Sequence, residues 1–403
     1  MVELLSPAGN AEKLRTAFNY GADACYMGLT EFSLRKNADN FSPSELDEVR
    51  RIKAETGKKL YCAMNILFKE RQIEKLWGMR DEIAEWPFDA FIVSDLGAVP
   101  FFKENFPDKE LHLSTQASSV NSSSVRMYHS LGFDRIILGR EASLDDIKRI
   151  KDRCPEVDLE VFVHGAMCMA YSGRCLLSSF LAGRSGNQGD CAHTCRWHYR
   201  LEEAERPGEY FPIEELDGYT TILSSKDLCM IDHIQELIDA GVSSFKIEGR
   251  MKSVYYVAVA TRAYRKAIDK DPDALVYRDD LFNVSHRAYT TGFFFDEAET
   301  ARANEGYERR YMFLGSVREK TGEDVYKLDV RNQIRSTDKL EFITPSVPFL
   351  SGAFALLDGE GNEVSQLDHG KPGFLRTSLD LPNGSIMRKE TGNTDQDIIM
   401  WRP

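Results

Sequence analysis

The chain contains no long hydrophobic run. No stretch approaches the roughly 18 consecutive apolar residues that a membrane-spanning helix needs. The opening Met-Val-Glu-Leu-Leu-Ser-Pro also lacks the basic and apolar regions of a signal peptide. We therefore expect a cytoplasmic protein that has no membrane partner.

The chain has no excess of basic residues either. Its 51 lysines and arginines stand against 64 aspartates and glutamates, which gives a formal net charge of −13. This balance argues against a uniformly basic coat for nucleic acid, although a local basic cleft can still hold phosphates. With 42% hydrophobic residues, the composition is that of a globular protein and not of a disordered one.

The local motifs of several common enzyme classes are missing. There is no His-Glu-x-x-His zinc site and no Gly-x-Ser-x-Gly elbow, which are typical of metalloproteases and serine hydrolases. No glycine fingerprint follows the first predicted strand, so a dinucleotide-binding doubly wound sheet is disfavoured. A peptidase would need a nucleophile assembled in space, such as a cysteine with His164 or His193.

Short apolar runs alternate with amphipathic, capped helical stretches through the first 250 residues. Most runs are four or five residues long and nearly continuously apolar, as parallel strands buried on both faces should be. They predict an α/β fold, a (β/α)8 TIM-like barrel. Because nine candidates exceed eight, residues 221–223 or another run must lie outside the barrel. The candidates are residues 3–5, 24–27, 59–63, 90–93, 111–113, 135–138, 159–163, 221–223 and 245–247.

A long connection and a change of period divide the rest of the chain. About 55 residues separate His164 from the next strand candidate, and such long insertions in compact domains are usually functional. Near the C-terminus the apolar residues recur with period two between glycine-containing turns, which predicts a small β-barrel. We thus predict a TIM-like barrel domain over 1–305, with a cysteine-bearing insertion at about 164–230, and a small β-barrel domain over 310–403.

Five of the eight cysteines fall within 62 residues, as Cys168-x6-Cys175-x15-Cys191-x3-Cys195-x33-Cys229. Four thiolates can hold zinc or ligate a 4Fe-4S cluster. Structural zinc modules typically use two short Cys-x2-4-Cys pairs, whereas this series has one, so the spacing favours the iron-sulfur cluster. Buried, inert cysteines are the alternative, but the surrounding loop is polar and glycine-rich.

The residues around these cysteines form a recognisable pattern. The segment Glu160-x-Phe162-Val-His164-Gly-Ala-Met-Cys168 and the Ser-Gly-Arg-Cys that follows resemble the signature of peptidase family U-32, the collagenase-like proteases. The resemblance covers essentially the whole chain and is strongest to the tRNA hydroxylation branch of that family. Further matching blocks are residues 4–9, 21–24, 33–35, 187–189, 195–197, 225–228, 246–250 and 264–268.

This resemblance implies a chemistry and a set of ligands. The implied activity is oxygen-independent hydroxylation of the tRNA wobble uridine to 5-hydroxyuridine, with prephenate as co-substrate and a 4Fe-4S cluster as cofactor. The implied partners are therefore tRNA and prephenate. The matching cluster ligands are Cys168, Cys175, Cys191 and Cys229, and Cys195 is the alternative to Cys191.

The substrate-binding candidates are arginines, because prephenate is a dicarboxylate and guanidinium groups bind carboxylates bidentately. They are Arg35, Arg140, Arg174 and Arg250, each of which could equally form a structural ion pair.

His164 is the candidate catalytic residue, because it could move a proton or donate a hydrogen bond to a cluster sulfur; a structural histidine at the barrel rim is the alternative. Tyr171, Trp197 or Tyr199 could stack on an extruded uridine, although core packing is the commoner role for each.

Three functions stay open on the sequence. The first is an RNA-modifying hydroxylase, the second is the peptidase that the family name implies, and the third is a noncatalytic, zinc-stabilised RNA-binding or assembly protein. Cysteine spacing favours the first over the third, and the missing protease motifs argue against the second. The C-terminal β domain is a candidate surface for a protein partner.

Overall fold

The computed structural model of the protein describes residues 2–33, 40–168, 170–197, 226–295 and 310–391. Three of the predicted features, Arg35, Tyr199 and the strand candidate at 221–223, lie outside the described residues. Within those ranges, no helix combines the length and the hydropathy required to cross a membrane.

The chain divides into two compact units. The barrel unit comprises Met1–Phe18, Ala22–Lys252 and Arg287–Gly306. The C-terminal unit comprises Asn19–Gly21, Ser253–His286 and Tyr307–Pro403. Residues 253–286 therefore group with the C-terminal strands, whereas the sequence pattern had placed them in the barrel domain.

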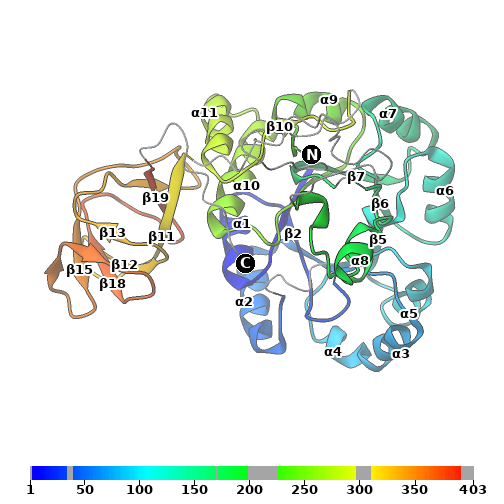
Figure 1. The fold of residues 1–403 in the computed structure, drawn as a ribbon, viewed down its shortest axis with the longest axis horizontal. Helices are drawn as coiled ribbons and strands as arrows, with labels where there is room; N and C mark the ends of the chain where they lie inside the picture. Colours follow the sequence, from blue (N-terminus) through cyan, green and yellow to red (C-terminus); the bar gives the residue numbers. More distant parts are fainter. Residues whose placement is uncertain (1, 34–39, 169, 198–225, 296–309, 392–403) are drawn as a thin grey trace, which may run out of the picture. The chain divides into compact units, whose positions relative to one another are not determined.

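Eight parallel strands close into a barrel within the barrel unit (Figure 1). They pair in chain order, and β9 completes the ring because it pairs with both β7 and β1. This arrangement confirms the predicted TIM-like barrel, and the eight strands correspond to eight of the nine candidate runs. They are β1 (Glu3–Pro7), β2 (Ala24–Met27), β3 (Lys59–Met64), β4 (Ala90–Val93), β5 (Glu110–Leu113), β6 (Arg135–Ile137), β7 (Asp158–Ala166) and β9 (Ser244–Ile247).

Helices surround the strands of the barrel unit in Figure 1. Their ends follow local chemistry: Ser143 Oγ accepts the Asp146 N–H at the start of α7, and Gly57 ends α2 in the left-handed region with φ 66°. One face of α7, formed by Leu144, Ile147 and Ile150, is buried. The helices are α1 (Ala11–Asn19), α2 (Leu46–Thr56), α3 (Glu70–Gly78), α4 (Arg80–Ala84), α5 (Val99–Asn105), α6 (Ser122–Ser130), α7 (Leu144–Arg153), α8 (Leu177–Ala182) and α9 (Ile234–Asp239).

Two short strands extend the sheet beyond the barrel. The strand β8 (Asp227–Cys229) runs antiparallel to the end of β7, where His164 pairs with Cys229 and Ala166 with Asp227. The strand β10 (Tyr289–Thr290) then pairs with β8 in parallel. Because β8 adds to the last residues of β7, this extension lies at the C-terminal end of the barrel, where active sites of such barrels are built.

The N-terminal end of the barrel interior contains a buried group of charged side chains. Glu160 on β7 has no solvent exposure and accepts from Lys246 Nζ at 2.8 Å and from Arg135 Nη1 at 3.2 Å. Arg135 also contacts Glu3 Oε1 at 2.5 Å. Burial alone disfavours the charged carboxylate, but Lys246 and Arg135 outweigh that cost and hold the pKa of Glu160 below its ordinary value.

The C-terminal unit contains an antiparallel β domain, in agreement with the predicted β-rich module. A seven-stranded sheet and a two-stranded one share a core that includes Leu314, Tyr326, Phe342, Leu375 and Met387. The strands are β11 (Tyr311–Lys320), β12 (Val325–Val330), β13 (Ile334–Arg335), β14 (Glu341–Ile343), β15 (Ala355–Asp358), β16 (Glu363–Val364), β17 (Gln366–Leu367), β18 (Gly373–Arg376) and β19 (Ile386–Glu390).

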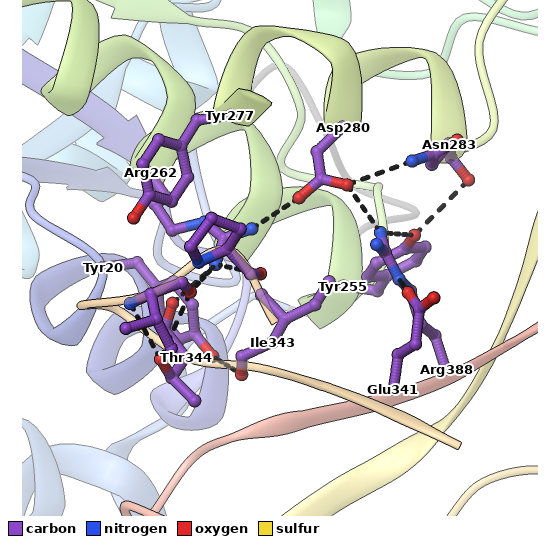
Figure 2. A network of polar contacts seen from close by, with 12 residues as sticks. Tyr20, Tyr255, Arg262, Tyr277, Asp280, Asn283, Glu341, Ile343, Thr344 and Arg388 are labelled. Carbon is purple, nitrogen blue, oxygen red and sulfur yellow. Dashed lines mark hydrogen bonds and ion pairs between the residues drawn. The ribbon is translucent and has the colours of Figure 1, made fainter. Parts of the chain in front are cut away.

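Two helices of the C-terminal unit are tied to these strands by buried charges (Figure 2). The helices are α10 (Val254–Ile268) and α11 (Ala274–Asp279). Asp280, just after α11, accepts from Arg262 Nη2 at 2.6 Å and from Arg388 Nη1 at 2.9 Å. Arg388 Nε also donates to Glu341 at 2.8 Å, and Arg262 Nη1 donates to the Thr344 carbonyl at 2.6 Å. This network explains why residues 253–286 group with the β domain.

We predict that Glu160→Gln lowers the free energy of unfolding of the barrel unit by about 3 kcal/mol at pH 7, because it leaves two buried cations without their carboxylate. The pKa of Glu160 is lowered on folding, so its stabilisation is complete above the unfolded-state pKa of about 4.3 and is lost as the pH falls through the lower folded-state value.

Urea unfolding of both proteins at a series of pH values measures this difference. It should be constant from pH 7 down to about 5 and should shrink in more acidic buffer. Glu104→Gln, at an exposed position of α5, is the matched control and should leave stability nearly unchanged. Equal stability of Glu160→Gln and the wild type would contradict the assignment.

Candidate functional site

The cysteine-bearing insertion docks on the C-terminal ends of the barrel strands. Ser172 N donates to Glu141 Oε1 at 2.8 Å, and Glu141 follows β6. Ser118, which follows β5, donates through its hydroxyl to the Ser172 carbonyl. Gly173 adopts a φ of 70°, and a Cβ at this position would lie 2.1 Å from the Gln116 carbonyl oxygen. Only glycine allows this close approach, so the insertion is fitted to the loop after β5.

A second anchor holds the insertion to the loop after β3. Leu67 N donates to the Asn187 carbonyl at 3.3 Å, and the Gln188 side-chain amide donates to the Leu67 carbonyl. Asn187 also donates through Nδ2 to the Cys175 carbonyl at 3.1 Å. The insertion therefore extends across the barrel end from the loops of β5 and β6 to that of β3, and α8 falls inside the ring of outer helices in Figure 1.

The eight cysteines separate into two groups by environment. Cys25, Cys62 and Cys154 have no solvent exposure and belong to the core of the barrel unit. Burial raises the pKa of Cys62 to about 12, which makes it an inert thiol. None of the five cysteines of the insertion forms a disulfide, and each is exposed or half-buried; they are Cys168, Cys175, Cys191, Cys195 and Cys229. The accessible thiols are thus those that the sequence had selected.

The insertion thiols have the chemistry of a metal site but are not gathered into one here. Among the described residues, no three His, Cys, Asp or Glu side chains lie close enough together to hold a metal ion. Cys191 Sγ accepts from the His193 N–H at 3.4 Å. Four accessible thiols outside any disulfide fit the donor set of a 4Fe-4S cluster, but binding one requires them to move closer to one another.

Cys229 and His164 lie opposite each other on neighbouring strands. Directly paired residues on antiparallel strands have their Cβ atoms about 5 Å apart on one face of the sheet. His164 is 1% exposed, and its ring lies 5.4 Å from the ring of Tyr289 on β10. The His164 carbonyl also accepts the Glu248 N–H at 2.8 Å. The predicted catalytic histidine is therefore held firmly beside one predicted cluster ligand.

A buried ion pair that the sequence did not reveal holds β8 in place. Arg287 donates through Nε and Nη2 to Asp227 Oδ1 at 3.0 and 2.6 Å, and its backbone N–H donates to Oδ2 at 3.2 Å. Both residues are buried. Although burial disfavours the carboxylate, Arg287 outweighs this and keeps the pKa of Asp227 below its ordinary value. Asp227 begins β8 and Cys229 ends it, so this pair positions the Cys229 thiol.

The structure describes three of the four predicted arginines, and these three lie in different environments. The Arg140 guanidinium lies 4.1 Å from the Phe162 ring centroid and 3.4 Å from Glu248, and it lines a small pocket. Arg250 is 4% exposed, and its guanidinium packs so closely on Gly28 that a Cβ there would lie 2.2 Å from Nη1. Arg174 is exposed on the insertion. Of the three, Arg140 is therefore in the best position to contact a bound ligand, because it lines a pocket.

Asp227→Asn should increase the reactivity of Cys229 toward iodoacetamide by about tenfold or more under native conditions, because a buried arginine that loses its partner destabilises its surroundings. Quantitative peptide mass spectrometry measures the labelling. Asp152→Asn, at an exposed position of α7, is the control and should leave Cys229 labelling unchanged. If Asp227→Asn labels Cys229 at the wild-type rate while circular dichroism shows a folded protein, the positioning role is wrong.

Known proteins are similar to this sequence over nearly its whole length. The profile described as Peptidase family U32 matches residues 9–304, and that of the Peptidase family U32 C-terminal domain matches residues 309–388. The chain is 36% identical to the tRNA hydroxylation protein P of Escherichia coli (strain K12), over 98% of each chain.

Two further relatives have other names. One is the 23S rRNA 5-hydroxycytidine C2501 synthase of Escherichia coli (strain K12), at 37% identity over 66% of this chain and 39% of that protein. The other is a collagenase of Porphyromonas gingivalis (strain ATCC BAA-308 / W83), at 31% identity over 78% of this chain and 79% of that protein. The two matching profiles, and the 36% identity over 98% of the chain, show that the chain belongs to peptidase family U32.

Proposed function

We propose that this protein is an RNA-modifying hydroxylase that acts on tRNA and converts the wobble uridine to 5-hydroxyuridine. The observation that carries the proposal is that the five accessible cysteines all belong to one insertion, which docks on the C-terminal end of the barrel. The names of its relatives, a tRNA hydroxylation protein and an rRNA hydroxycytidine synthase, support the same reaction class. The wobble base is already unpaired in the anticodon loop, so an enzyme reaches it without opening a duplex.

The proposed cofactor is a 4Fe-4S cluster. Its proposed ligands are Cys168, Cys175, Cys191 and Cys229, with Cys195 as the alternative to Cys191. Such a cluster supplies electron-transfer chemistry that no amino-acid side chain provides. The contribution of the protein is to hold the thiols and the substrate: Asp227 and Arg287 position Cys229, and His164 lies beside that thiol, where it can donate a hydrogen bond or hold a proton.

Prephenate is the proposed co-substrate. Replacing the C5–H bond of uridine by C5–OH oxidises the base by two electrons, so without dioxygen a co-reactant must be reduced by two electrons as it supplies the oxygen atom, and we assign that role to prephenate. Arg140 is the leading candidate for binding a prephenate carboxylate, because its guanidinium lies beside the Phe162 ring in a small pocket lined by the residues just after β6 and the middle of β7. Arg174, exposed on the same insertion as the thiols, and Arg250 are further candidates, and the C-terminal β domain is a proposed docking surface for a protein partner.

Anaerobic purification followed by iron, sulfide and zinc analysis tests the cofactor. We expect about four iron and four sulfide per chain in the wild type and loss of both in Cys175→Ala. Cys25→Ala is the control, because that thiol is buried outside the insertion and should not affect iron content. Cys191→Ala and Cys195→Ala identify the third ligand by which of them loses iron. A zinc-loaded wild type would contradict the cluster and favour the zinc-stabilised RNA-binding protein.

Analysis of tRNA nucleosides in a deletion strain tests the function. We expect 5-hydroxyuridine and the nucleosides made from it to disappear from the tRNA and to return with the wild-type gene. The Cys175→Ala gene should fail to restore them, whereas Cys25→Ala should restore them. Unchanged tRNA nucleosides in the deletion strain would contradict the proposed substrate.

A peptidase is the second candidate, because Cys229 and His164 face each other as a cysteine nucleophile and its base would. The collagenase among the relatives is consistent with it. This alternative predicts gelatin hydrolysis that is lost in Cys229→Ala but survives in Cys175→Ala. The hydroxylase predicts no hydrolysis by either the wild type or the variants.

A further inference from the structure

The cysteine-bearing insertion exposes an unusual amount of apolar surface. Among the residues of the insertion that the structure describes, five large side chains are exposed, namely Tyr171 (69%), Leu176 (61%), Phe180 (81%), Leu181 (49%) and Trp197 (44%). Elsewhere in the described parts of the chain such residues are scattered singly or in pairs, as is normal for a protein surface. A concentration of exposed apolar side chains within one short segment marks an interaction site.

Packing and a hydrogen bond within the insertion hold the backbone that carries Phe180, Leu181 and Trp197. Phe180 and Leu181 belong to α8, which packs against the turn η5 (Thr194–Arg196). Ser178 Oγ on α8 accepts the Ala192 N–H at 2.9 Å and so fixes this packing. Trp197 directly follows η5. The exposed rings of Phe180 and Trp197 are thus held on adjoining pieces of one folded segment.

The first part of the insertion is locally basic, although residues 164–230 as a whole contain six basic and nine acidic residues. Residues 167–197 contain three arginines, Arg174, Arg184 and Arg196, and a single acidic residue, Asp190. Arg184 Nε contacts Asp190 at 2.9 Å, whereas Arg174 is exposed. The chain as a whole carries a formal charge of −13. A local positive excess suits a polyanionic partner such as the RNA backbone.

We propose that Tyr171, Phe180 and Trp197 form a stacking surface for unpaired nucleotides of the RNA substrate, with Arg174 at a phosphate. Aromatic rings combined with basic side chains are the usual means of binding single-stranded nucleic acid, because every base offers a flat face for stacking. This inference rests on the proposed function and specifies the place on the protein where the RNA binds. Cys175 lies between Tyr171 and Phe180 in the sequence, so the surface brings the RNA to the thiols.

The test is RNA binding by the full-length protein, measured by fluorescence anisotropy with a labelled anticodon stem-loop and a labelled duplex of equal length. Phe180→Ala and Trp197→Ala should each weaken stem-loop binding by about tenfold. Phe180→Tyr, which keeps an aromatic ring, should bind like the wild type. Met127→Ala is the matched control, because Met127 is 63% exposed on α6, away from the insertion, and should have no effect. Arg174→Gln should lower the salt dependence of binding by about one unit of slope.

Two results would overturn the stacking surface. The first is wild-type stem-loop affinity in both alanine variants. The second is a change in oligomeric state of Phe180→Ala in light scattering, which would make the surface a contact between copies of the chain. If either occurs while cellular tRNA still depends on the gene, the proposed function stands without this surface. Failure of the function itself is recognised separately, by unchanged nucleosides in the deletion strain.

Discussion

The structure depends on one strand that serves both the core and the site. β7 is nine residues long, whereas the other barrel strands have three to six. Its first part pairs with β6 and β9, closes the barrel and contributes Glu160 to the interior. Its last part, from His164 to Ala166, pairs with β8; His164 still pairs with β9 as well, and Gly165 and Ala166 extend beyond that pairing. The cysteine-bearing insertion begins there, so the closed core fixes the point from which the thiols are presented.

Each unit contains a buried carboxylate that is paired with two cationic side chains. In the barrel unit the Glu160 carboxylate lies between two cations, and in the C-terminal unit Asp280 is shared by two arginines. Such pairs stabilise little compared with apolar packing, but removing one partner is costly because the other charge stays buried. Each unit therefore admits few alternative packings of its charged elements. The cysteine insertion combines both kinds of contact: loop hydrogen bonds anchor its first part to the barrel, the buried Asp227–Arg287 pair holds the strand of Cys229, and its thiols stay accessible.

Much of the fold could be predicted from the sequence, because continuous apolar runs separated by capped helices report directly on strands buried on both faces. The position of Arg140 just after β6 followed from the same pattern, whereas His164, next to a strand predicted to end at residue 163, lies inside β7, which continues to Ala166. Two contacts could not be predicted, namely the Asp227–Arg287 pair and the hydrogen bond of Ser172 to Glu141. They join residues 60 and 31 positions apart, and no sequence pattern around these residues indicates that they meet. The grouping of α10 with the β domain was missed for the same reason, because Arg262 meets Asp280 and Thr344 only in the folded chain. The choice between Cys191 and Cys195 stays a prediction, because four residues of separation put both thiols in the same part of the insertion.

Hydroxylation of tRNA at the thiol-bearing insertion is tested most directly by anaerobic incubation of the purified, iron-loaded protein with an unmodified tRNA transcript and prephenate, followed by nucleoside mass spectrometry. We expect the wobble uridine to gain the mass of one oxygen atom only when the protein and prephenate are both present. The proposed activity would be contradicted if the fully loaded protein left the transcript unchanged, or if Cys175→Ala hydroxylated it as well as the wild type.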